Sequence, residues 1–504
     1  FLLLLAAFQL ATGVLAARIA ARASVGFAAN LREDMYNNVQ TFAFSNIDKF
    51  STASIITRLT TDTTNVQNAF QMLMRMAIRA PVMLIFSMIV SFRISRDISM
   101  TFLIILPILA LALFFIIRSV FPVFSRVFRT YDELNNVVQE NVRGIRVVKS
   151  FNQERHEIGK FDAISARIYQ DFSKGERLIT LNAPLMQFCI YTCMIVISWL
   201  GAKAIIASGN DPALGLTTGN LTALITYTMQ ILSSLMMLSM VFAMLTISLS
   251  SARRIAEVLE ERSDIPQPEQ PVMTVRDGAV DFDHVSFVYA SKADKKVLDD
   301  IDLHIRSGET VGVIGGTGAS KSSLVQLIPR LYDVTGGKLT LGGVDVRDYD
   351  LDTLRGAVAM VLQKNELFSG TIAENLRWGN ENATDEQLRH ACKLACADEF
   401  ISAMPDGYDT HIEQGGTNVS GGQKQRLCIA RALLKKPKVL ILDDSTSAVD
   451  TRTDAQIQQA LSTYIPDTTK IIIAQRISSV QNADRIVVLD DGRINAVGSH
   501  DELL

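Results

Sequence analysis

Residues 310–323 read Thr-Val-Gly-Val-Ile-Gly-Gly-Thr-Gly-Ala-Ser-Lys-Ser-Ser, an apolar strand that runs into a glycine-rich turn and a helix start. Glycine lets successive backbone N–H groups turn toward an anion, and the positive end of the helix adds to the attraction. The stretch predicts a phosphate-binding loop, in which Lys321 reaches the β- and γ-phosphates and Ser322 binds Mg²⁺. Ser320 stands where the strict pattern has glycine, and the loop alone would also fit a simple turn. The candidate nucleotide-binding residues are Gly315, Gly316, Thr317, Gly318, Ala319, Ser320, Lys321, Ser322 and Ser323.

A second apolar strand, residues 439–442, ends in Asp443 and Asp444, about 120 residues further on. Strands of this kind deliver a carboxylate to Mg²⁺ beside a bound nucleotide. Alone, the pattern also fits a core strand that ends in a polar turn. After a phosphate-binding loop, it predicts that Asp443 is a Mg²⁺ ligand.

A second helix start rich in serine and glycine lies between these two stretches. It consists of Val419, Ser420, Gly421, Gly422 and Gln423, and such a start is also an anion site. One protein rarely needs two phosphate-binding helix starts so far apart. We therefore expect this one to serve a nucleotide held by another subunit.

Composition divides the 504 residues into two parts. Residues 1–262 hold 24 Lys and Arg against 17 Asp and Glu, whereas residues 263–504 hold 25 against 35. Neither part is basic enough to indicate nucleic-acid binding. The sequence predicts a transmembrane domain over 1–260 and an α/β domain over 262–504, joined by a linker with three prolines. Five stretches reach about the 20 apolar residues that cross a bilayer: 1–21, 78–95, 98–121, 180–207 and 219–249.

The connections between these five stretches alternate between long and short. The long ones, 22–77 and 123–177, carry most of the Lys and Arg, which places them and the second domain in the cytoplasm. They hold few Gly or Pro, so we expect helices that continue beyond the bilayer rather than loops. Two separate soluble insertions are the alternative. The five scattered cysteines are interpreted as reduced thiols rather than as a metal site.

Several motifs now resemble those of the ABC transporter family. Val419–Gln423 is similar to its signature motif, usually LSGGQ, and Ser447–Asp450 is similar to its D-loop. Tyr289 matches the aromatic residue that stacks on adenine, and Gln363 matches the Q-loop glutamine, which senses Mg²⁺. Matches in the membrane half are Arg58 and Asp62 in the first intracellular loop, and Glu140, Gly144, Arg146, Val147, Lys149 and Phe151 around the second coupling helix.

The resemblance implies a helical transmembrane domain of the ABC exporter type followed by an α/β P-loop ATPase domain. It also implies ATP and Mg²⁺ as cofactors, with Ser322, Gln363 and Asp443 as metal ligands, in a bacterial cell membrane. Exporter halves have six spanning helices, so the family's first helix would precede this sequence. The expected partners are a second half-transporter, the lipid bilayer and a small-molecule substrate.

Two catalytic positions depart from the family pattern. Asp444 stands where the general base is normally Glu, and Gln475 stands where the switch residue is normally His. Aspartate is one methylene shorter, and glutamine cannot carry a proton. The combination resembles the subunit of heterodimeric multidrug exporters whose Walker motifs line a degenerate, weakly hydrolytic site.

Other functions stay open at this point. A homodimeric exporter of lipid or peptide with atypical catalytic residues is the main alternative, and a soluble ABC ATPase or a nucleotide-gated channel are others. The last apolar stretch contains five methionines among Ser, Thr and Gln, which suits varied hydrophobic or amphipathic substrates. Ordinary helix packing would explain the same residues.

Overall fold

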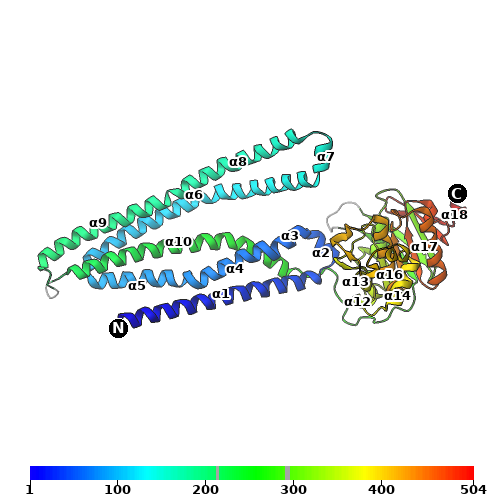
Figure 1. Cartoon of the computed structure of the whole chain (residues 1–504), viewed down its shortest axis with the longest axis horizontal. Coiled ribbons are helices and arrows are strands. Elements are labelled where there is room, and N and C mark those ends of the chain that lie inside the picture. Colours follow the sequence, from blue (N-terminus) through cyan, green and yellow to red (C-terminus); the bar gives the residue numbers. More distant parts are fainter. Residues whose placement is uncertain (212–214, 290–295) are drawn as a thin grey trace. The chain divides into compact units, whose positions relative to one another are not determined.

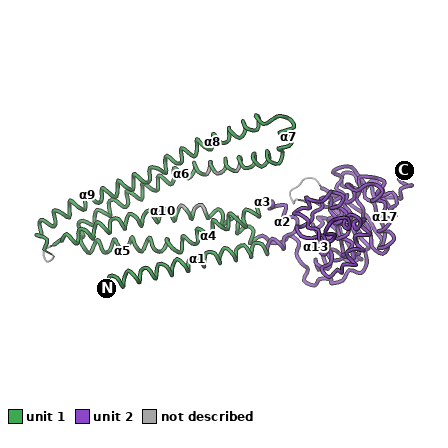
Figure 2. The backbone as a smooth tube through the Cα atoms, in the orientation of Figure 1, with its two compact units in different colours: residues 1–37, 53–260 green, residues 38–52, 261–504 purple. Residues whose placement is uncertain are grey.

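The computed structural model describes residues 1–211, 215–289 and 296–504. These residues form two compact units (Figure 2): residues 1–37 with 53–260, and residues 38–52 with 261–504. Residues 212–214, within one predicted external connection, lie outside the described residues. The second unit thus takes a short segment from early in the chain, residues 38–52, which contains α2 (Phe44–Lys49).

The first unit is entirely helical in its described part. Its long helices run side by side in an extended bundle (Figure 1). The helices are α1 (Leu2–Gln40), α3 (Thr52–Thr57), α4 (Thr63–Met72), α5 (Arg79–Ile94), α6 (Arg96–Arg143), α7 (Ile145–Ser150), α8 (Glu154–Thr180), α9 (Asn182–Ser208) and α10 (Thr218–Glu260), with π-helical turns at Arg58–Asp62 and Leu73–Ala77.

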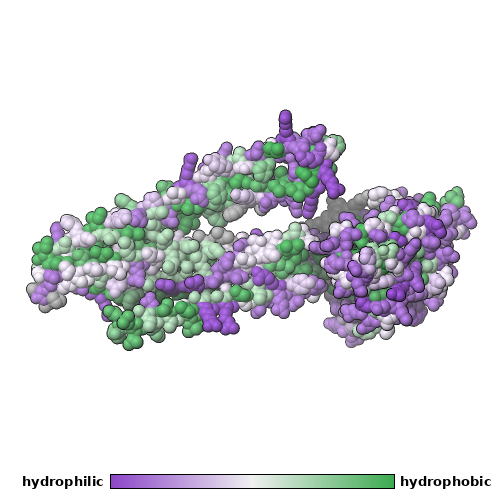
Figure 3. Space-filling model, viewed as in Figure 1, coloured by the Kyte–Doolittle hydropathy of each residue, from purple (hydrophilic) through white to green (hydrophobic). Residues whose placement is uncertain are grey.

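Five helical stretches in the described residues are long and apolar enough to cross a membrane, which confirms the prediction of five spans. The long connections are helical, as expected. Helix α6 alone has 48 residues, or about 72 Å at 1.5 Å per residue, more than twice the hydrocarbon core of a bilayer. Apolar residues cover much of this unit's visible surface, whereas polar residues gather around α7 (Figure 3).

Helix α10 holds the first unit together through both apolar and polar contacts. Leu224 and Ile231 are fully buried. At its cytoplasmic end, the Arg254 guanidinium forms a two-pronged ion pair with Asp62, and Glu257 pairs with Arg58 at 2.9 Å. Side-chain hydrogen bonds between spanning helices are a common way to fix their packing. Arg58 and Asp62, from the predicted intracellular loop, are therefore anchored to α10.

The second unit contains two larger sheets. The antiparallel one has the strand order β2-β1-β4-β5, and the other has the order β12-β11-β3-β10-β9-β6, parallel except for β12. The strands are β1 (Val280–Phe287), β2 (Leu298–Ile305), β3 (Thr310–Gly315), β4 (Gly336–Leu341), β5 (Val344–Asp345), β6 (Val358–Val361), β9 (Val439–Asp443), β10 (Thr469–Ile473), β11 (Arg485–Asp490) and β12 (Arg493–Gly498), with β7 (Gly370–Thr371) and β8 (His411–Ile412) as a small separate pair.

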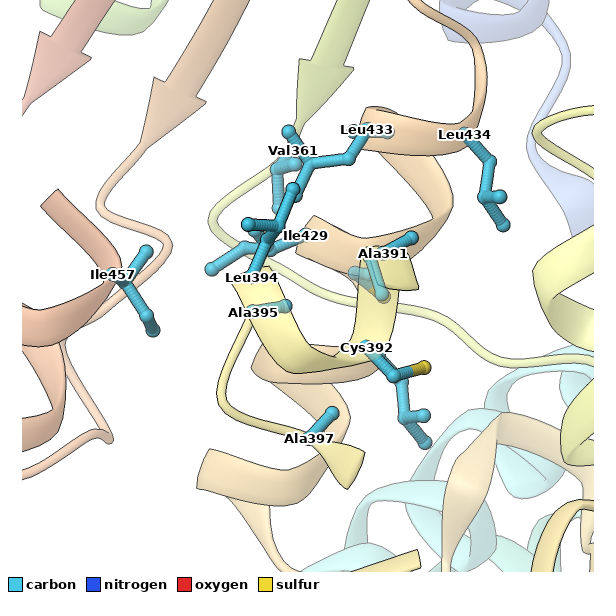
Figure 4. Close-up of a cluster of buried hydrophobic side chains, with 14 of the residues drawn as sticks. Val361, Ala391, Cys392, Leu394, Ala395, Ala397, Ile429, Leu433, Leu434 and Ile457 are labelled. Atoms are coloured by element: carbon cyan, nitrogen blue, oxygen red, sulfur yellow. The ribbon is translucent and has the colours of Figure 1, made fainter. Parts of the chain in front are cut away.

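Helices complete the second unit, and one buried cluster joins several of them to the parallel sheet (Figure 4). The cluster contains Val361, at the end of β6, together with Leu394, Ile429 and Ile457, which come from three different helices. The helices are α11 (Lys321–Gln326), α12 (Leu351–Ala357), α13 (Ile372–Arg377), α14 (Asp385–Leu394), α15 (Asp398–Ser402), α16 (Gly421–Leu434), α17 (Thr451–Tyr464) and α18 (His500–Leu503). The predicted order of fold classes, a helical domain with membrane-spanning stretches followed by an α/β domain, is confirmed.

Candidate nucleotide site

The parallel sheet brings four predicted motifs to one edge. Because β3, β10, β9 and β6 run in the same direction, their carboxyl ends meet there. The phosphate loop follows β3, Asp443 ends β9, Gln475 follows β10 and Gln363 follows β6. Ligands bind at this end of the strands in open α/β sheets.

Backbone geometry explains the glycines of the loop. A Cβ at Gly315 would lie 2.2 Å from the Leu489 carbonyl oxygen, so no larger residue fits. At Gly316 and Gly318 a Cβ would meet nothing within 4 Å, which leaves this side of the loop open to a phosphate. Lys321 donates hydrogen bonds to the carbonyl oxygens of Gly315 and Gly316, each at 2.8 Å. The lysine therefore lies across the mouth of the loop.

Ser320 adopts left-handed backbone angles, φ 67° and ψ 22°. Glycine tolerates this region, whereas a side chain makes it strained. This conformation is the physical reason why the loop pattern has glycine at the position. The departure recognised from sequence is thus a strained residue in an otherwise well-formed loop.

Asp443 and Ser322 lie together at the end of β9. Asp443 is only 4% exposed. Burial raises the pKa of its carboxyl, and the Ser322 hydroxyl and Lys321 oppose the rise. A carboxylate, a hydroxyl and the amide oxygen of Gln363 are all oxygen ligands, which Mg²⁺ prefers. The residues therefore fit the cation that the motif implies.

The two departures from the family pattern contact each other. The Gln475 side-chain amide donates to Oδ2 of Asp444 at 2.9 Å, and the Gln363 amide donates to the same oxygen at 3.3 Å. Asp444 itself adopts a left-handed φ of 48°. The base position, the switch position and the Q-loop thus converge on one carboxylate oxygen.

Tyr289 lies just after β1 and is 44% exposed. Its hydroxyl shares a hydrogen bond of 2.7 Å with Ser323, in the first turn of α11. Its ring packs edge-to-face with Phe287 and with Tyr332, at centroid distances of 4.8 and 5.1 Å. The predicted base-stacking residue is therefore fixed beside the phosphate loop.

The Ser-Gly-Gly-Gln stretch forms the start of α16. The Ser420 hydroxyl accepts from the Gln423 backbone N–H, and the Gln423 side chain accepts from the Ser420 N–H. This reciprocal capping box fixes the helix start. A Cβ at Gly422 would lie 2.8 Å from the Ala448 carbonyl oxygen. No hydrogen bond in the described part of the chain joins Val419–Gln423 to the phosphate loop, so the structure does not bring these two predicted anion sites together.

Three functional contacts were not predicted from sequence. Buried Gln425 donates to Ser447 Oγ and accepts from the Ala448 N–H, which ties α16 to residues 447–450. Arg476 donates to the Ser447 and Val449 carbonyl oxygens. Tyr332 contacts Tyr289. A polar residue on an otherwise apolar helix face was the sequence signal that could have identified Gln425. No motif or spacing near Tyr332 indicated its role.

The chain is similar to known proteins over nearly its whole length. Residues 1–249 match the family model for the ABC transporter transmembrane region, and residues 298–447 match that for the ABC transporter. The uncharacterized ABC transporter ATP-binding protein YfiB of Bacillus subtilis is 36% identical over 500 residues, which are 99% of this chain and 86% of that protein.

Two further similarities come from a curated protein and a solved structure. An ATP-dependent lipid A-core flippase of Desulfotalea psychrophila is 32% identical over 462 residues, 90% of this chain and 78% of the flippase. The structure of a bacterial Atm1-family ABC exporter with ATP bound superposes with a TM-score of 0.81 at 25% identity, covering 96% of this chain and 83% of that one.

Proposed function

This chain belongs to the ABC transporter family, and we propose that it is one subunit of a heterodimeric exporter in which its own phosphate loop lines the weaker ATP site. It is an exporter half-transporter: an integral membrane domain fused to a cytoplasmic domain that binds ATP and couples hydrolysis to transport. The proposed substrate is a small hydrophobic or amphipathic molecule.

The environment of Asp444 carries the proposal. A general base must hold a water within hydrogen-bond reach. Here Oδ2 of a side chain that is one methylene short accepts hydrogen bonds from two amides, those of Gln475 and Gln363. An amide cannot take up or pass on a proton. ATP bound at this site is therefore held with little turnover.

Binding and orientation of ATP need none of the altered positions. Lys321 and the open N–H groups of the loop would hold the phosphates, and the Tyr289 ring would stack on the base. Ser322, Asp443 and Gln363 would hold Mg²⁺, which neutralises charge on the phosphate oxygens when bound. The chain's own site is thus equipped for binding rather than for hydrolysis.

The start of α16 supports a role in another subunit's site. Ser420 and Gly422 keep the family pattern, and the capping box and the close approach to Ala448 hold them in place. In the proposed heterodimer, they complete the partner's site, which carries Glu and His at the two altered positions. Hydrolysis takes place there.

An exposed apolar surface on the ATP-binding domain supports pairing with a second half-transporter. Phe368 and Trp378 stack at 4.0 Å and are 46% and 64% exposed. Helix α7 and the residue after it also expose apolar side chains, including Val147 and Phe151. We propose that the partner's equivalent of α7 docks on Phe368 and Trp378, and that residues 144–151 of this chain dock on the partner.

A restoration experiment tests the proposal. We expect the purified chain alone to hydrolyse ATP slowly, and Asp444→Glu combined with Gln475→His to raise steady-state turnover at least about 10-fold, since a well-placed base contributes about 10²–10⁴-fold. The matched control is Gln459→His, on the exposed face of α17. If the unsubstituted chain alone already turns over as fast as the doubly substituted one, the homodimeric alternative replaces the proposal. The similarity to a lipid A-core flippase makes a lipid the first substrate to test in that case.

A further inference from the structure

Tyr332 lies between the segment 38–52 and the base-stacking residue Tyr289. It is 9% exposed. Its hydroxyl donates to Oδ2 of Asp48, in α2, at 2.8 Å. Its ring packs edge-to-face against Tyr289, at 5.1 Å and 90°, and contacts Phe44 of α2 at 6.0 Å. One side chain thus contacts both α2 and the nucleotide site.

The loop that carries Tyr332 is fixed by the ATP-binding domain itself. The Arg330 guanidinium pairs with Asp333 at 2.7 Å and donates to the Arg347 carbonyl oxygen. Arg355 donates to the Arg330 carbonyl oxygen at 3.1 Å. Because these contacts do not involve α2, they hold the loop around Tyr332 without it, but they do not fix the orientation of the Tyr332 side chain. The contribution of α2 is the Asp48 carboxylate, which accepts the hydrogen bond of the Tyr332 hydroxyl.

That hydroxyl is protonated and donates to a carboxylate. Burial and the neighbouring carboxylate of Asp48 raise the pKa of Tyr332 well above its usual range, so it keeps its proton. A buried hydroxyl without an acceptor is costly, and a hydrogen bond to a charged acceptor is stronger than one to a neutral acceptor. Docking of α2 therefore stabilises one orientation of Tyr332.

Tyr289 is confined in turn by Tyr332. Edge-to-face packing is directional, so the orientation of the Tyr332 ring limits that of Tyr289. The Tyr289 hydroxyl also binds Ser323 at the start of the phosphate-loop helix. Asp48, Tyr332, Tyr289 and Ser323 therefore form a continuous line of contacts from α2 to the phosphate loop.

We infer that Tyr332 is a positioning residue for the nucleotide base, through which base stacking on Tyr289 and docking of residues 38–52 stabilise each other. The inference rests on the proposed role of Tyr289. If docking of α2 raises nucleotide affinity by a given factor, thermodynamic linkage requires bound nucleotide to favour docking of α2 by the same factor. The expected size is about 3- to 10-fold, the amount that one buried hydrogen bond contributes.

Hydrogen exchange of residues 38–52 in the full-length transporter in lipid nanodiscs tests this link. We expect saturating Mg²⁺ and AMP-PNP to slow exchange in the unsubstituted protein. Tyr332→Phe removes only the hydroxyl. We expect it to abolish the nucleotide-dependent slowing of exchange in residues 38–52 and to lower AMP-PNP affinity about 3- to 10-fold. Tyr349→Phe is the matched control, since that buried hydroxyl donates to the Leu341 carbonyl oxygen, away from α2. A merely structural tyrosine would change exchange equally with and without nucleotide.

Asp48 supplies a second, independent variant. Asp48→Ala should reproduce the effect of Tyr332→Phe, Asp48→Asn should keep part of the link because its amide oxygen still accepts, and the double variant should be no worse than either single one. Full nucleotide-dependent protection in Tyr332→Phe, or additive losses in the double variant, would overturn the inference. Tyr289→Leu distinguishes a failure of the proposed base-stacking role from a failure of the inference alone. If it leaves AMP-PNP affinity unchanged, the base-stacking role and the inference both fail. If it weakens affinity while Tyr332→Phe does not, only the inference fails.

Discussion

Two polar turns of the ATP-binding domain contrast with each other: the start of α16 at Ser420–Gln423, and the turn after β9 at Asp444. At the first, a capping box and a close glycine contact hold the family's residues in place. At the second, a left-handed aspartate accepts hydrogen bonds from two glutamine amides. In the proposed heterodimer, only the first turn acts on the hydrolysed nucleotide. Under this proposal, the chain gives up hydrolysis at its own site and is still required for hydrolysis at its partner's.

The largest expected effect comes from blocking the first turn. Ser420→Arg should reduce steady-state ATPase of the purified complex by more than about 100-fold, because a bulky cation at the helix start excludes the partner's nucleotide. Asp444→Asn should cost less than about 3-fold, since a base worth about 10²–10⁴-fold is already lacking at that site. Equal loss in the two variants would remove the contrast and with it the degenerate-site proposal.

Lys321→Ala tests whether the weaker site still binds ATP. The lysine would contribute charge-assisted hydrogen bonds to the phosphates, each worth about 1.5–3 kcal/mol. We expect ATP affinity at this site to fall about 10- to 100-fold, measured by displacement of a fluorescent nucleotide. Lys338→Ala, at an exposed position of β4, is the control. Unchanged affinity in Lys321→Ala would mean that the phosphate loop is assigned wrongly.

Gln425→Leu tests the contact that joins α16 to residues 447–448, shortly after Asp444. Gln425 is 5% exposed and bonds both Ser447 and the Ala448 N–H. Its loss removes the acceptor of the part-buried Ala448 N–H, at a cost of about 1 kcal/mol, the net contribution of one hydrogen bond. We expect a lower unfolding temperature and several-fold slower turnover. Gln459→Leu, on the exposed face of α17, should change neither.

The smallest effect, and one of opposite sign, is expected at Ser320. Its left-handed backbone disfavours any side chain, so Ser320→Gly should stabilise the domain by about 1 kcal/mol. Thermal unfolding of the purified protein would detect a rise of a few degrees. Ser462→Gly, in the last turn of α17, should have the opposite sign and destabilise slightly, because glycine is a poorer helix former than serine. A fall in unfolding temperature for Ser320→Gly would contradict the strain argument.

The site could be predicted from sequence where local rules decide it. Thr310–Ser323 and Val439–Asp443 each encode a strand and the polar turn that follows, and the parallel sheet then gathers these turns at one edge. Apolar length likewise predicted the five spans, because a bilayer imposes a minimum on each helix.

Contacts between distant segments could not be predicted in this way. Tyr332 and Asp48 are 284 residues apart, and neither lies in a motif. The π-helical turn at Arg58–Asp62 was not predicted from periodicity either, and both of its end residues pair with side chains of α10. Both features involve contacts between segments far apart in the sequence, and a single sequence does not show such contacts directly.

The segment 38–52 also sets an order of events during synthesis. Phe42 and Phe50 are buried, and the Asn46 side chain bonds Glu261 and Arg262, more than 200 residues later in the chain. At about 5–20 residues per second, the ribosome needs roughly 10–40 s to make that stretch. During this time, the segment has emerged but its packing surface does not yet exist. These two phenylalanines are therefore a natural target for chaperones that guard unfinished chains, and their burial marks a late step in maturation.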